Sequence, residues 1–205
     1  GHGFAADGTW GFPADFARNL PPEPQWDIDG VSRLMSDDPR SFRMAGFDTI
    51  ILSPPNFVQW AAPDQETLEG AMLDMVGHPF DWARNQGRLR FLVYEGWADL
   101  SEFDSFPPSD RAMRRYHAFN LGEYDAWYRD FTERLRVRLP GENIDLIPVA
   151  RVISGLLTDG PLSGLAATDL YSDDAPHGTA TTYLLAAMIT YAVLYAEPPP
   201  AIGLP

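Results

Sequence analysis

Three short apolar runs constrain the fold of this chain more than any other feature of its sequence. They are FDTIIL at 47–52, LRFLVY at 89–94 and IDLIPV at 144–149, and β-branched or aromatic side chains are frequent in them. Apolar runs of this length that end at proline or polar residues are typical of buried strands. Because both faces of each run are apolar, the pattern favours a parallel sheet with helices on both sides.

The segments between and after these runs carry helical patterns. We expect helices over four ranges: 64–85, 110–138, 150–158 and 179–196. Strands that alternate with helices predict an α/β protein, whose chemistry lies beyond the carboxyl ends of its strands. The 205 residues are predicted to form one domain, 1–205, whose first 46 residues are mostly loop, with a short strand over 3–7.

Charge and composition exclude several classes of function. The net charge is −14 and all 15 basic residues are arginine, a balance that disfavours nucleic acid and anionic membrane as partners. Without cysteine the chain has no disulfide, thiol nucleophile or thiolate metal site. The histidines and acidic pairs lack zinc and calcium spacings, so we predict neither metal nor cofactor. No apolar stretch is long enough to predict a membrane span.

The segment most informative about chemistry is DLYSDDAPHGTATTYLLAA, residues 169–187. It places Asp174 three residues before His177, just ahead of a predicted helix. A carboxylate beside an imidazole fixes its tautomer and stabilises the imidazolium that forms when the ring takes up a proton. The same text also fits a helix-entry loop, in which Asp173 or Asp174 caps backbone N–H groups and His177 is solvated.

The segment resembles the last block of the SGNH (GDSL-like) hydrolases, in which an Asp-x-x-His pair precedes the C-terminal helix. FDTIILSPPNFVQW is similar to the block that follows the third strand of that family. FLVYEGW and MITYAVLYAEPPP look similar to a bacterial branch of it. The resemblance covers most of residues 4–200. It implies a three-layer α/β/α sandwich of flavodoxin-like type, and relatives are often exported, which favours a periplasmic or secreted protein.

The resemblance also implies roles for particular residues. His177 would be the general base and later the general acid, and Asp174 would orient it. Asn56 would donate a side-chain N–H to the oxyanion, and Gly8, or Gly11 as the alternative, would donate a backbone N–H. The implied reaction is hydrolysis of a carboxylic ester through an acyl-serine, on a small ester or an acylated carbohydrate.

The chain departs from the family pattern at two places. Pro54 stands where the family has Gly, two residues before Asn56, and proline lacks an N–H. The Gly-x-Ser block of the nucleophile has no counterpart, because GHGF at 1–4 has Gly3 at the serine position, and Ser53 and Ser172 match no family block. We expect an upstream segment to carry the first strand and the serine, and to associate with this chain. The alternative is a non-catalytic binding protein on a decayed hydrolase scaffold.

Trp97 is the last candidate, because it follows the end of the strand predicted at 89–94. A tryptophan at that position is suited to be an aromatic wall for an acyl chain or a sugar ring. The other interpretation is that its ring attaches the loop to the body of the protein.

Overall fold

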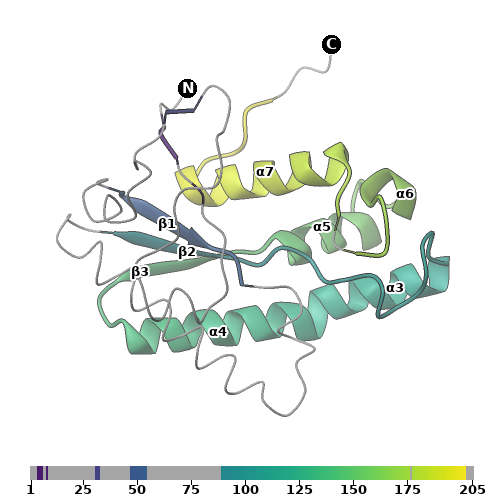
Figure 1. Ribbon diagram of the computed structural model, residues 1–205, viewed down its shortest axis with the longest axis horizontal. Coiled ribbons are helices and arrows are strands. Elements are labelled where there is room, and N and C mark those ends of the chain that lie inside the picture. Colours follow the sequence, from purple (N-terminus) through teal and green to yellow (C-terminus); the bar gives the residue numbers. More distant parts are fainter. Residues whose placement is uncertain are drawn as a thin grey trace. The chain divides into compact units, whose positions relative to one another are not determined.

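The computed structural model describes residues 4–6, 8, 31–32, 47–54, 89–175 and 177–201 (Figure 1). Contacts divide the chain into two compact units. Among the described residues, the first unit comprises 4–6, 8, 31–32, 47–51, 89–92 and 133–144, and the second comprises 52–54, 93–132, 145–175 and 177–201. The helix predicted over 64–85 lies outside the described residues, and the single-domain assignment stays a prediction.

All three predicted strands are present, as β1 (Thr49–Leu52), β2 (Arg90–Tyr94) and β3 (Asn143–Ile147). They form a parallel sheet in the order β1-β2-β3, which confirms the predicted α/β class. Just beyond the end of β2, the Glu95 N–H donates at 3.1 Å to the carbonyl of Ile147, the last residue of β3. Of the strand predicted over 3–7, the structure describes residues 4–6, where Ala5 forms an isolated parallel bridge with Ser32.

The strands differ in how far they are buried. Phe91, Leu92 and Val93 of β2 have no exposed surface, as expected for a central strand whose two faces are both covered. Ile51 of β1 is 46% exposed, so burial on both faces does not extend to that strand. The local sequences predict strands equally well, but β2 has a hydrogen-bonded neighbour at each edge.

The long helix predicted over 110–138 consists of three consecutive parts, of which Figure 1 labels α3 and α4. Their bounds are α3 (Asp110–Phe119), the π-helical turn η4 (Asn120–Tyr124) and α4 (Asp125–Arg138). The hydroxyl of Ser109 accepts the Ala112 N–H at 3.3 Å and so caps the start of α3. The sequence pattern predicted one continuous helix over this range and did not predict the π turn.

Three helices follow β3 in the second unit: α5 (Val149–Thr158), α6 (Ala167–Leu170) and α7 (Ala180–Tyr195). Helix α5 packs against α3, η4 and α7, and α6 packs against α7. The predicted helices over 150–158 and 179–196 are thus confirmed, whereas α6 was not predicted. The buried core of this unit includes Val93, Tyr116, Tyr124, Tyr128, Phe131, Ile147, Ile153 and Leu170.

Candidate functional site

A tight loop places His177 directly before α7. Tyr171 and Gly178 form an antiparallel bridge that closes the loop. Inside it, the backbone N–H and the hydroxyl of Ser172 both donate to the His177 carbonyl, at 3.0 and 3.2 Å. The His177 N–H donates to the Ala175 carbonyl at 2.8 Å. These backbone contacts hold the histidine in place while its side chain remains 64% exposed.

The carboxylate that contacts the imidazole belongs to Asp173. Its Oδ2 lies 2.8 Å from Nδ1 of His177, whereas its Oδ1 is buried with no hydrogen-bond partner among the described residues. Asp174, to which the family pattern gives this role, is exposed, and its backbone carbonyl accepts the Ser101 N–H at 2.8 Å. The structure therefore differs from the expectation by one residue. The pattern counts positions along the chain, but the bend of the loop decides which side chain faces the ring.

Polar side chains of the long helix hold the segment that follows β2, residues 95–98. The Tyr124 hydroxyl donates to the Glu95 carbonyl at 3.0 Å, and the Tyr116 hydroxyl donates to the Ala98 carbonyl at 2.9 Å. Between them, Asn120 Oδ1 accepts the Ala98 N–H at 3.3 Å. These three residues are four positions apart, whereas one turn of an α-helix takes 3.6 residues, so each side chain would be rotated by about 40° around the helix axis relative to the one before. The wider turn of η4 takes up part of this rotation and keeps the three side chains on one side.

Trp97 lies within this held segment and is only 8% exposed. Its ring centroid is 5.9 Å from that of Tyr183 in α7. A Cβ added at Gly178 would lie 3.2 Å from Cζ2 of Trp97, so the indole packs against the residue that follows His177. Trp97 therefore exposes little surface to a ligand, and Tyr183, which is 53% exposed, is the exposed ring here.

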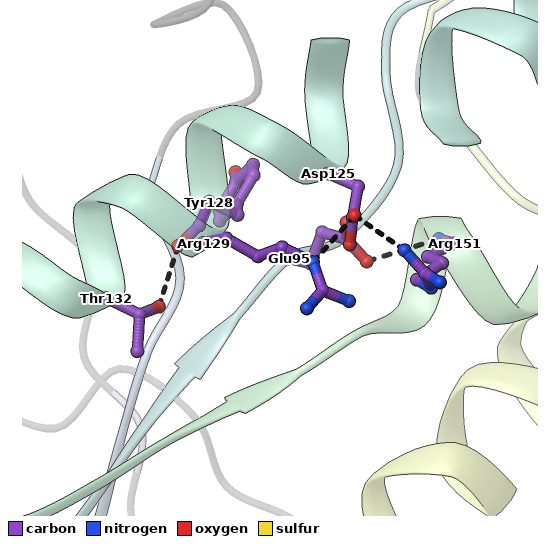
Figure 2. Close-up of polar contacts among 6 residues, drawn as sticks. All are labelled: Glu95, Asp125, Tyr128, Arg129, Thr132 and Arg151. Carbon is purple, nitrogen blue, oxygen red and sulfur yellow. Dashed lines mark hydrogen bonds and ion pairs between the residues drawn. The ribbon is translucent and has the colours of Figure 1, made fainter. Parts of the chain in front are cut away.

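Two buried carboxyl groups, Glu95 and Asp125, form a second polar cluster that the sequence analysis missed (Figure 2). Asp125 Oδ2 accepts Nε of Arg129 at 2.7 Å and a guanidinium N–H of Arg151 at 2.8 Å. Glu95 Oε2 accepts the backbone N–H of Arg151, in the first turn of α5, at 3.2 Å. Glu95 thus acts as a distant cap for a helix whose own N-cap, Pro148, makes no side-chain bond.

Burial determines the charge state of Glu95. The side chain has no exposed surface, and desolvation raises its pKa from 4.5 to about 8, with Asp125 adding to the rise and the α5 N–H groups opposing it. Glu95 is therefore mostly protonated at neutral pH. Two signals in the sequence could have indicated the cluster. The first is an acidic residue directly after an otherwise apolar strand, and the second is the i,i+4 spacing of Asp125 and Arg129.

The second histidine of this unit, His117, is buried. Its Nδ1 lies 3.1 Å from the Ser154 hydroxyl, and burial lowers its pKa to about 4. The ring is neutral at pH 7 and packs edge-on against Tyr116. These contacts make His117 a packing residue, as the aromatic helix sequence around it indicates.

The remaining candidates are not brought together by described contacts. Asn56, Gly11 and Gly3 lie outside the described residues, and Gly8 belongs to the first unit. Ser53 and Ser172 are both exposed. Pro54 is buried, and its carbonyl accepts the Tyr128 hydroxyl at 3.4 Å. The oxyanion roles of Asn56 and Gly8 stay predictions.

Comparisons of the chain with protein-family models, curated proteins and solved structures found no match. The described residues contain no group of three or more His, Asp or Glu side chains that could hold a metal ion. In the same part of the chain, every helix is too short or too polar to cross a membrane.

Proposed function

We propose that this chain is an ester hydrolase of the SGNH type, with a three-layer α/β/α fold, in which His177 is the general base. The observation that carries the proposal is the 2.8 Å contact between Nδ1 of an exposed His177 and the Asp173 carboxylate. A ring that donates Nδ1–H to a carboxylate keeps its Nε2 lone pair for the proton of a hydroxyl. An exposed ring gives substrate access to that lone pair.

The proposed reaction is acyl transfer to a serine hydroxyl, followed by transfer to water. His177 Nε2 accepts the hydroxyl proton as the oxygen attacks the ester carbonyl, and then returns it to the departing alcohol. Asp173 holds the tautomer and stabilises the imidazolium between these two transfers. The serine is proposed to come from a segment upstream of residue 1, with Asn56 and Gly8 as the oxyanion donors.

Hydrolysis of p-nitrophenyl acetate by the full-length protein tests the proposal. We expect His177→Ala to lower kcat/KM on the order of 10²–10⁴-fold, since it removes the general base. His117→Gln is the matched control, because it removes an imidazole that lies in the core, and its folded fraction should keep wild-type turnover. Wild-type turnover in His177→Ala would contradict the assignment. A folded wild-type protein with no turnover would favour a non-catalytic binding protein on the same scaffold.

A further inference from the structure

Two arginines of the second unit, Arg129 and Arg151, converge on a single carboxylate oxygen (Figure 2). Nε of Arg129 in α4 and a terminal guanidinium nitrogen of Arg151 in α5 lie 2.7 and 2.8 Å from the same atom, Oδ2 of Asp125. Because both donors share that oxygen, the two guanidinium groups are close neighbours. Like charges repel each other, so the negative charge of Asp125 is what holds the two cations together.

The two arginine side chains are exposed to solvent, whereas the acids of the cluster are buried. The side chains of Arg129 and Arg151 are 54% and 49% exposed, against 5% for Asp125, and Glu95 has no exposed surface. A guanidinium carries five N–H donors, and each of these two uses one of them on Asp125 in the described part of the chain. An anion that approaches from solvent therefore meets the remaining guanidinium N–H groups rather than the buried carboxyls.

The charges of this cluster do not cancel. Two cations share the single charge of Asp125, and the carboxyl of Glu95 accepts the backbone N–H of Arg151 rather than a guanidinium N–H. Glu95 adds no full negative charge at neutral pH, because burial raises its pKa to about 8. One positive charge is thus left over, in a chain whose net charge is −14. Arg136 of the same helix, by comparison, pairs with Glu133 at 3.2 Å.

The cluster lies at the carboxyl ends of two parallel strands, where ligands of α/β sheets bind. Glu95 directly follows β2, and Arg151 lies in the first turn of the helix that follows β3. The planar fork of a guanidinium matches the paired oxygens of a carboxylate or a phosphate group. We infer that Arg129 and Arg151 together bind the oxyanion group of a small ligand, a carboxylate or a phosphate ester. This inference does not depend on the proposed ester hydrolysis, because it uses no group of the loop that carries His177.

Titration of the ¹⁵N-labelled full-length protein with sulfate and, separately, with acetate tests the inference at an ionic strength held constant with sodium chloride. Sulfate imitates a phosphate ester, and acetate imitates the carboxylate of a ligand. We expect saturable shifts of the Arg129 and Arg151 Nε–H resonances, each assigned by its loss in the corresponding Arg→Gln variant. Arg136, which is 45% exposed on the same helix, is the matched control, and its resonance should stay. Arg151→Gln should weaken binding on the order of tenfold, because it removes one of two charged donors, whereas Arg136→Gln should not change it.

The pH dependence of binding distinguishes this cluster from the general charge of the surface. Sulfate and acetate keep their charges between pH 7 and pH 9, whereas Glu95 loses its proton over this range. The groups that face Glu95 are Asp125 and Arg129 of α4, Arg151 of α5 and Tyr124 of η4. The arginines stay charged, and burial holds the pKa of Tyr124 well above its ordinary value. The surplus positive charge should therefore disappear, and sulfate should bind severalfold more weakly at pH 9 than at pH 7, relative to Glu95→Gln.

The two anions also identify the kind of ligand. Saturation by sulfate alone indicates a phosphate ester, saturation by acetate alone indicates a carboxylate, and saturation by both supports the shared oxyanion chemistry. Stationary Arg129 and Arg151 resonances, or equal shifts with sodium chloride alone, would show that the two arginines only stabilise the fold and would overturn the inference. The same holds if the wild type and Glu95→Gln show the same pH dependence of binding, since the anion would then lie elsewhere. If Arg151→Gln does not fold, Arg151→Lys keeps the charge at Asp125 and should still weaken binding, because it lacks the fork.

Discussion

The carboxyl groups of Asp173 on one side, and of Asp125 and Glu95 on the other, lie in opposite environments within the second unit. Asp173 meets His177 on a loop where both side chains are substantially exposed, at 45% and 64%. Asp125 binds the side chains of Arg129 and Arg151, Glu95 binds the backbone N–H of Arg151, and both acids have almost no exposed surface. An exposed pair adds little stability, because water and salt screen it, yet its ring stays accessible to substrate. A buried group stabilises structure through its hydrogen bonds and offers a substrate no access.

The largest expected effect distinguishes the two neighbouring aspartates of the exposed loop. Asp173→Asn should lower kcat/KM for p-nitrophenyl acetate on the order of 10²–10⁴-fold, because an amide no longer stabilises the imidazolium. The matched control is Asp174→Asn, which should retain turnover within about threefold, since its side chain makes no described contact with His177. If Asp174→Asn lost turnover and Asp173→Asn kept it, Asp174 would be the orienting residue, as the family pattern implies. Neither variant should change the free energy of unfolding by more than about 1 kcal/mol.

The next largest effect is expected at Asp125, in the buried group of carboxyls. Asp125→Asn should lower the free energy of unfolding by about 1.5–3 kcal/mol, because it weakens two charge-assisted hydrogen bonds to arginine. Urea denaturation measures the change, and Asp130→Asn, an exposed acidic residue of the same helix, is the control. Turnover of the folded fraction should remain close to wild type. A variant that is fully stable yet inactive would place Asp125 in the catalytic machinery instead.

The smallest effect is a dependence of stability on pH. Glu95 has a folded-state pKa of about 8 against an ordinary value of 4.5, so between these values the folded protein binds more protons than the unfolded chain. Its contribution is complete below pH 4.5 and is lost as the pH rises through 8, with a slope of at most about 1.4 kcal/mol per pH unit.

The range from pH 6.5 to 8 isolates this contribution. His117, whose pKa is lowered to about 4, acts in the opposite direction only below its ordinary value of 6.5. Glu95→Gln imitates the protonated acid, so its free energy of unfolding should stay flat over this range, while that of the wild type falls. Parallel curves for the two proteins would show that Glu95 is not the responsible group.

Much of the fold followed from local patterns. Strands β1, β2 and β3 lie within one residue or two of the predicted runs, because short β-branched segments bounded by proline or polar residues have few alternatives. The ends of α5 and α7 were predicted nearly as well. The π turn and the short helix α6 were missed, since elements of five and four residues are shorter than the stretch that a periodicity needs to show.

The candidate site was likewise predicted in part. The local spacing in the sequence predicted that an imidazole and a carboxylate meet just before α7. Only the tertiary structure decided that the carboxylate is Asp173, through the bend of a loop closed by Tyr171 and Gly178. It also decided that the Trp97 ring is buried beside that loop and that Glu95 is withdrawn from water. Burial is the sum of contacts from distant segments, and it raises the pKa of Glu95 to a value that no local pattern contains.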